Sequence, residues 1–181
     1  MDYYGGRELA SAFRTVRNNT IKIANEIPEE KYDFKASPET RTIRETLVHI
    51  AIGTTFSNHV HRNRVSDMST VNWQELMANF NAEQAKSRTK DEIVALLRAE
   101  GDGFASYVEG LSDSFLAEDV KMMPGGQPPA KTRFELLLSV KEHEMHHRAQ
   151  LMLMQRMIGL VPHLTREREE RMAQMQATSK A

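Results

Sequence analysis

The sequence predicts an all-α protein, a four-helix bundle with a long crossover between its second and third helices. Two patterns and the length of the chain predict it. Three capping boxes each open a long run with helical periodicity, and no segment shows the alternation of a strand. A chain of 181 residues suits one domain with a core of ordinary size.

The first helix has the weakest start, after Gly5 and Gly6, but a clear apolar seam. Apolar positions recur at alternating intervals of four and three residues, as the buried stripe of a helix should. The helix should end near Pro28, because proline cannot continue it. The seam consists of Leu9, Phe13, Val16, Thr20, Ile23 and Ile27.

The capping boxes mark the starts of the other three helices. In each box a Thr caps the first turn and a Glu three residues later reaches back to the Thr amide. The boxes TIRE, TKDE and TRFE predict helices over residues 42–62, 89–111 and 132–159. Inside the crossover, NWQE predicts a short helix from near Asn72 that ends before the polar run NAEQAKSR. With such a crossover, neighbouring helices need not all be antiparallel.

Helix breakers bound the fourth helix. The segment from Lys121 to Lys131 contains two Gly and three Pro, so we expect a loop there. Gly159 should stop the helix at its other end. We expect a single domain over residues 1–165 and a polar tail over residues 166–181. The tail is either a frayed or solvated end, or a helix that packs on a partner subunit.

Composition excludes several partners and sites. A formal net charge of −1 leaves no basic surplus, so we expect no nucleic acid partner. No stretch approaches the roughly 20 apolar residues that span a bilayer, and we expect a cytoplasmic protein without membrane contact. With no cysteine, any metal site must use His, Asp or Glu. The second helix has more apolar surface than one core uses, so we expect a homodimer.

The stretch KEHEMHHRAQ places three histidines inside the fourth helix. At about 100° per residue, His143 and His147 fall within about 20° of Leu136 on the apolar stripe, whereas His146 falls about 80° away. An unpaired buried imidazole costs about 1–3 kcal/mol, so two of them need an explanation. Histidines at i and i+4 can bind one metal ion. A wet edge of the bundle beside neighbouring glutamates is the other explanation that the spacing leaves open.

The same residues match the H-E-x-x-H pattern of zinc proteases, with Glu144 as the general base. The third ligand of such a site should follow downstream, but RAQLML has neither the Gly nor the His at the needed place. Acidic residues in the tail could replace it only from beyond Gly159 and Pro162. No sheet is predicted that would hold a peptide, so the protease interpretation is disfavoured.

The chain resembles the DinB-like superfamily of metal-binding four-helix bundles, which includes YfiT-type thiol transferases and mycothiol-dependent maleylpyruvate isomerases. The resemblance covers roughly residues 5–165 and depends on ETLVHIA, on GLVP, and on EHEMHHRAQ, which is similar to the family's H-x-x-x-H-R-G-Q. It implies that His49, His143 and His147 bind one divalent ion whose fourth position is open. Three histidines favour zinc or nickel. The family's Gly after the Arg is Ala149 here.

The resemblance implies a transferase that adds a low-molecular-weight thiol to an electrophilic small molecule. An ion with an open position can also activate water, so a metal-dependent hydrolase of a small molecule is the alternative. A non-catalytic interaction protein stabilised by a metal is the second alternative.

Several further side chains carry weaker expectations. Glu100 interrupts the apolar seam of the third helix and Gln150 lies on the histidine stripe, so both are candidates for a catalytic or positioning role. We expect Arg148 to pair with a carboxylate on a neighbouring helix. His59 and His61, near the end of the second helix, should cap it or lie at the surface.

Overall fold

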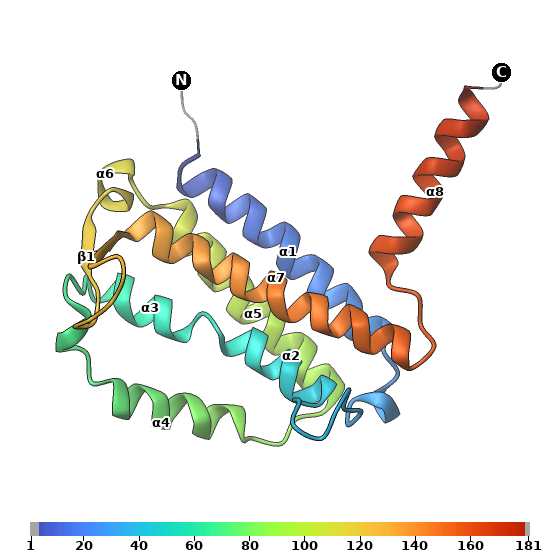
Figure 1. Ribbon diagram of the computed structural model, residues 1–181, viewed down its shortest axis with the longest axis horizontal. Coiled ribbons are helices and arrows are strands. Elements are labelled where there is room, and N and C mark those ends of the chain that lie inside the picture. The colour runs from blue at the N-terminus through green and yellow to red at the C-terminus, as the bar shows by residue number, and fades with distance from the viewer. Residues whose placement is uncertain (1–3, 180–181) are drawn as a thin grey trace.

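The computed structural model describes residues 4–179 and has the predicted all-α architecture (Figure 1). Four helical rods form the bundle: α1, α2 continued by α3, α5 and α7. α4 lies along the outside of α2 and α3, and α8 projects away from the end of the bundle (Figure 1). The helices are α1 (Gly6–Glu26), α2 (Ile43–Ile52), α3 (Thr55–Arg62), α4 (Trp73–Gln84), α5 (Lys90–Glu109), α6 (Asp113–Leu116), α7 (Arg133–Met157) and α8 (His163–Thr178), with single 3-10 turns at Glu29–Lys31 and Met68–Thr70.

The crossover sets the directions of the rods. α4 returns the chain to the end of the bundle at which α2 begins, so α5 runs parallel to α2 and α3, and α7 runs parallel to α1 (Figure 1). Antiparallel helices joined by short loops would have alternated instead. The predicted crossover and the predicted short helix within it are therefore confirmed. α4 continues through Gln84, however, so the prediction that it ends before NAEQAKSR is wrong.

All three capping boxes form. Thr42 accepts a hydrogen bond from the Glu45 amide at 3.0 Å, and the Glu45 carboxylate accepts one from the Thr42 amide at 2.7 Å. The same reciprocal pair opens α5 and α7. At the far end of α7, Gly159 has φ +85°, a conformation that favours glycine and ends the helix. The predicted starts and stop are confirmed.

The second predicted helix is interrupted, which is a correction. Residues 42–62 form α2 and α3, with a break at Gly53 and Thr54. Glycine is a weak helix former, and here the missing side chain makes room for a neighbour. A Cβ at Gly53 would lie 3.3 Å from the ring of His143 on α7. The break therefore occurs where α7 brings a histidine against the backbone of the second rod.

The predicted loop from Lys121 to Lys131 is confirmed over residues 122–129, but its two ends are strands. Residues Asp119–Lys121 form β1 and Ala130–Thr132 form β2, an antiparallel pair at the end of the bundle. Val120 on β1 is fully buried. The hairpin is held to the crossover by the Lys121 amide, which donates to the Ser66 carbonyl at 2.9 Å. These pairings involve segments distant in sequence, which local patterns do not specify.

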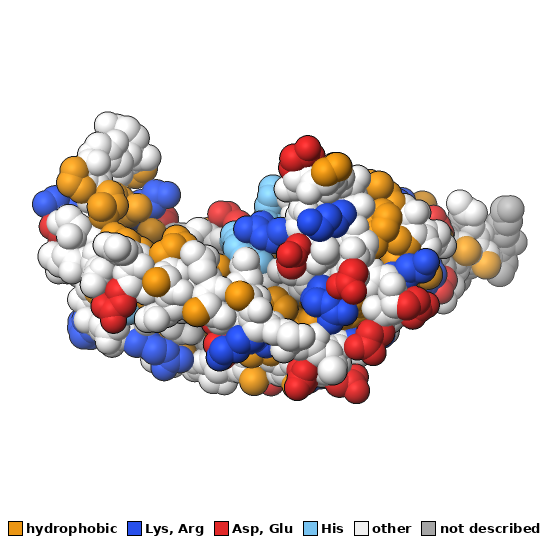
Figure 2. Space-filling view, turned by 90° about the horizontal axis from the view of Figure 1, so that it is seen from below, with side chains coloured by type: hydrophobic (Ala, Val, Ile, Leu, Met, Phe, Trp, Pro, Cys, Tyr) orange, Lys and Arg blue, Asp and Glu red, His pale blue; other side chains and the backbone are white. Residues whose placement is uncertain are grey.

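The apolar surface of the second rod is largely used within one chain. α2 packs against α5, α7 and α4, and Phe80 of α4 is buried in the same apolar cluster as α2. The surface that predicted a homodimer is therefore covered by α4. None of the helices in residues 4–179 is long and apolar enough to cross a membrane. The face drawn in Figure 2 mixes acidic, basic and apolar side chains, as the near-zero net charge predicts.

The tail is a helix over most of its length. α8 spans His163–Thr178, and apart from His163 its described residues are exposed or half-buried. The tail is therefore helical and not frayed over these residues, and its packing on a partner subunit stays a prediction. His163 itself is buried, and its Nε2 lies 3.2 Å from the Asn19 side-chain oxygen.

Candidate metal centre

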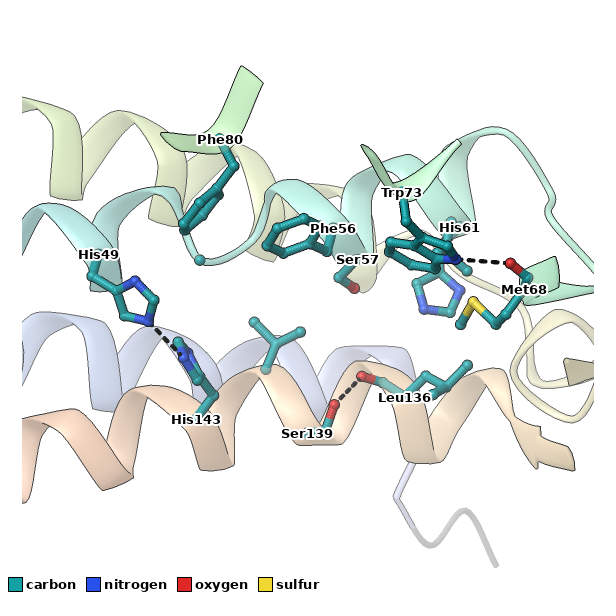
Figure 3. Close-up of a pocket in the computed structure, with 13 residues that line it drawn as sticks. His49, Phe56, Ser57, His61, Met68, Trp73, Phe80, Leu136, Ser139 and His143 are labelled. Atoms are coloured by element: carbon teal, nitrogen blue, oxygen red, sulfur yellow. Dashed lines mark hydrogen bonds between the residues drawn. The ribbon is translucent and has the colours of Figure 1, made fainter. Parts of the chain in front are cut away.

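Three histidines from two rods converge in the middle of the bundle. His49 comes from α2, and His143 and His147 lie one turn apart on α7. One ring nitrogen of each lies within 4.8 Å of those of the other two. Figure 3 shows His49 and His143 facing each other across the gap between the rods, with their Nε2 atoms 3.1 Å apart. The structure thus brings together the three residues that the family resemblance implied.

Two glutamines orient the rings. The Nδ1 of His49 donates to the Gln84 side-chain oxygen at 2.9 Å, and the Nδ1 of His147 donates to the Gln150 oxygen at 2.8 Å. These roles follow because an amide oxygen is only an acceptor, which places the ring proton on Nδ1. The lone pair of each Nε2 is then directed at the cluster. Such outer hydrogen bonds are typical of metal-bound histidines.

The donor set fits a divalent ion such as zinc. Two nitrogens each about 2.0–2.1 Å from one tetrahedral ion lie about 3.3–3.4 Å apart, close to the 3.1 Å between His49 and His143. Burial lowers the pKa of His49 and His147, and burial with the neighbouring imidazoles lowers that of His143 to about 4. The rings are therefore neutral at pH 7, as metal ligands must be.

Glu144 does not serve this cluster. It is 2% exposed, and both of its oxygens accept from Arg17 Nε at 3.0 Å, while Thr20 Oγ1 donates to it at 2.7 Å. Arg17 is itself buried, and a Cβ at Gly101 would lie 2.7 Å from its side chain. Glu144 therefore forms a buried ion pair with α1, on a side of α7 about 60° around the helix from His147. The zinc-protease interpretation loses its general base.

The other expected residues are placed as follows. Gln150 positions His147, and His146 lies beside Gln150 at 3.2 Å, outside the group of three. Glu100 is half-buried on α5, and within residues 4–179 the cluster of candidate ligands contains no carboxylate. The role of Glu100 as a general base stays a prediction. Arg148 is half-buried, and burial lowers its pKa; the structure records no ion pair for it in the described chain.

His61 is not at the surface, which corrects the prediction. It is 1% exposed, and burial lowers its pKa to about 4, with a further contribution from Arg133. Arg133 Nη1 approaches its Nδ1 at 3.4 Å. Arg133 is 2% exposed, and its Nε donates to Glu118 at 2.8 Å. The sequence gives no local signal for this arrangement, because Arg133 lies 72 residues from His61.

An apolar pocket of about 280 Å³ opens from the histidines and runs between α3, α4 and α7 (Figure 3). His49 and His143 form one end and His61 the other. Phe56, Phe80 and Trp73 line one side. Residues of the crossover thus form a wall of the pocket, which no local sequence pattern predicted.

A second hollow, of about 490 Å³, is lined by Gln150, whose side-chain oxygen accepts from His147. It is more polar and includes Arg41. The positive charge of Arg41 contributes to the lowered pKa of all three clustered histidines. The cluster therefore lies at one end of an uncharged pocket, and a residue that binds His147 lines a hollow that contains one cation and one anion, Arg41 and Glu39.

The model of the DinB superfamily matches residues 12–151 of the chain, well over half of it. The chain belongs to the DinB superfamily. The matched region contains His49, His143 and His147. No protein with curated annotation matches the chain.

Solved structures show the same DinB fold at low sequence identity. A DinB-like protein of Bacillus subtilis, YjoA, is 20% identical, with a TM-score of 0.62 over 84% of this chain and 92% of that one. YfiT from Bacillus subtilis is 12% identical, with a TM-score of 0.66 over 86% of this chain and 88% of that one. It is described as a probable metal-dependent hydrolase with an unusual four-helix bundle topology. A putative DinB family member from Exiguobacterium sibiricum is 16% identical, with a TM-score of 0.60 over 87% of this chain and 95% of that one.

Proposed function

We propose that this DinB protein is a transferase that joins a low-molecular-weight thiol to an electrophilic small molecule. His49, His143 and His147 would hold one divalent ion, zinc or nickel. The observation that carries the proposal is the convergence of three neutral imidazoles at one end of an apolar pocket. A polar hollow lined by Gln150, which hydrogen-bonds to His147, offers a second substrate a place near the cluster.

The residues of the chain position the histidine ligands and set the environment of the two substrates. When bound, such an ion lowers the pKa of a coordinated thiol and so supplies a nucleophile at neutral pH. Gln84 and Gln150 hold the rings of His49 and His147 in the ligating tautomer. Arg41 lines the polar hollow together with Glu39, and its guanidinium offers a partner for an anionic group of the thiol. The apolar pocket keeps the electrophile away from water.

Among residues 4–179, the lack of a carboxylate within the histidine cluster supports thiol transfer over hydrolysis. Hydrolysis of an amide or ester gains from a group that passes a proton to the leaving atom. Within residues 4–179 no carboxylate joins the cluster, and Glu144 is engaged by Arg17. A metal-dependent hydrolase is the second candidate, because YfiT, with a similar fold, is described as one.

Metal analysis tests the proposal first. The protein is purified without chelators and compared with His49→Ala, His143→Ala and His147→Ala by elemental analysis. Each substitution should remove most of the ion, whereas His146→Ala, the matched control outside the cluster, should keep it. If the control loses as much metal as the three others, the assigned ligand set is wrong.

A reaction screen on the loaded protein follows. Thiol conjugates are measured by mass spectrometry with an electrophile panel and several small thiols, and ester hydrolysis is measured in parallel. Thiol conjugates that depend on the three histidines support the transferase. Hydrolysis without conjugation supports the second candidate, and inactivity in both with a bound ion that exchanges no ligand supports a structural metal.

We also propose a homodimer. Because α4 covers the apolar surface of α2, the contact between subunits would be made by α8. Two of its side chains, Met172 and Met175, are 52% and 68% exposed. Methionine on an exposed helix suits contact with a partner surface. Sedimentation at micromolar concentration tests the assembly, and a protein that is monomeric under these conditions would contradict it.

A further inference from the structure

The apolar pocket has uncharged walls. It is lined by 13 residues, and none of them is Asp, Glu, Lys or Arg. On α7 the lining runs from His143 back to Leu136, two helical turns or about 10 Å. Burying an unpaired charge in such a place is very costly. The walls therefore select an uncharged molecule of elongated shape.

Three aromatic rings, tilted against one another, form one wall of the pocket. The centroid of Phe56 lies 4.8 Å from that of Phe80 and 6.3 Å from that of Trp73. The indole Nε1 of Trp73 donates to the Met68 carbonyl at 2.8 Å, which holds the ring in place. Aromatic surfaces of this kind stack on flat unsaturated ligands. Figure 3 shows the three rings along one side of the pocket, opposite α7.

One polar group in this wall is unused. The hydroxyl of Ser57 is buried and has no hydrogen-bond partner in the described protein. A second lining serine, Ser139, differs because its hydroxyl donates to the Leu136 carbonyl at 2.7 Å. A buried hydroxyl without a partner costs about 1–3 kcal/mol. Ser57 lies between the aromatic rings on the pocket wall, so a rotation of its side chain that turns the buried hydroxyl toward the pocket would let it donate to an acceptor on a bound ligand (Figure 3).

The far end of the pocket is neutral as well. His61 closes it, and burial keeps this imidazole uncharged at neutral pH. Arg133 lies behind it and donates to Glu118 at 2.8 Å, and Glu118 also pairs with Arg64. The end wall of the pocket itself offers a neutral imidazole edge to a ligand.

We propose that this pocket binds an uncharged, flat, apolar molecule that carries one hydrogen-bond acceptor, and that Ser57 donates to that acceptor. Ser57 is thus a specificity-determining residue. The inference deepens the proposed function, because it assigns the electrophile to the apolar pocket and leaves the polar hollow beside Arg41 to the thiol. The reaction of the bound molecule rests on the proposed function. Its binding to the apolar pocket does not, because that binding requires no metal.

A fluorescence titration tests the binding. The probe is prodan, a neutral naphthalene ketone, and the reporter is Trp73, the single tryptophan of the chain, which lines the pocket. Prodan should quench Trp73 by energy transfer and show the emission of a buried, hydrogen-bonded ketone. The anionic dye anilinonaphthalene sulfonate should bind at least tenfold more weakly. Both titrations are made on metal-free and zinc-loaded protein.

Matched serine variants test the assignment of Ser57. Ser57→Ala should weaken prodan binding about threefold to tenfold and shift its bound emission to the blue, because one hydrogen bond is lost. Ser139→Ala should change the affinity less than twofold, since that hydroxyl is already bonded to the backbone. Equal effects of the two substitutions would overturn the role of Ser57.

The outcomes separate this inference from the proposed function. Absence of prodan binding in both metal states, or tighter binding of the anionic dye, overturns the pocket assignment while the metal analysis stands by itself. Loss of metal binding with prodan binding intact overturns the proposed function and leaves the pocket. Val140→Phe, which adds a ring in the pocket, should abolish prodan binding while far-UV circular dichroism is unchanged.

Discussion

Replacing Glu144 with leucine should destabilise the protein strongly, because it leaves the Arg17 guanidinium alone in the core. The two side chains are 2% and 4% exposed, and Arg17 also donates to the Leu97 carbonyl at 2.7 Å and to the Ile50 carbonyl at 3.2 Å. Breaking a buried pair by removing one partner costs about 3–5 kcal/mol. The total free energy of unfolding of a domain of this kind is about 5–15 kcal/mol.

Urea unfolding followed by far-UV circular dichroism measures this effect. With a slope of about 2 kcal/mol per molar urea, a loss of about 4 kcal/mol moves the midpoint down by about 2 M. Glu142→Leu, on the exposed side of the same turn, is the control and should change stability by less than about 0.5 kcal/mol. The double variant Arg17→Met with Glu144→Leu should recover most of the loss, because no unpaired charge stays buried.

The result that refutes this reasoning is specific. If Glu144→Leu unfolds at the same urea concentration as Glu142→Leu, the ion pair does not stabilise the fold. If Glu144→Leu instead keeps its stability and loses activity, the glutamate acts as a base after all, and the protease-type assignment returns.

Three further predictions follow from the same structure. Gln84→Ala removes the acceptor of His49 Nδ1, so zinc affinity should fall about tenfold to 100-fold in competition with a chromophoric chelator; unchanged affinity would show that α4 does not orient the ligand. Gln155→Met should raise the free energy of unfolding by about 1–3 kcal/mol in urea, because both amide atoms of this fully buried side chain lack partners; a loss of stability would reveal a missed hydrogen bond. His61 has its pKa lowered from 6.5 to about 4 on folding, so the unfolded chain binds the extra proton and stability falls as pH drops through this range, by about 1.4 kcal/mol per pH unit. His61→Phe should flatten the pH dependence of the urea midpoint below pH 6.5, and a slope equal to that of the parent protein would contradict the buried neutral state.

Short-range signals predicted the helices well. Each capping box joins residues three apart, and the seam of α1 repeats over single turns, so both form from neighbours in the chain. All six seam residues of the first helix are buried. The placement of His143 and His147 on one side of α7 follows from the same helical period.

The errors lie where distant segments meet. The break between α2 and α3 occurs at a glycine against His143, and the hairpin pairs β1 with a segment beyond a Gly- and Pro-rich turn. Neither contact leaves a periodic trace in the sequence. The unused hydroxyl of Ser57 likewise becomes meaningful only when α4 and α7 enclose it.

By itself, the sequence determined that this protein is helical, where its main helices start, and which two histidines share a side of the fourth rod, because those properties depend on residues within a turn of each other. The tertiary structure alone decided that Arg17 neutralises Glu144 across 127 positions and that Gln84 fixes His49 across 35. It did so because hydrogen bonds and burial act through space, and the crossover decides which side chains come within their short range.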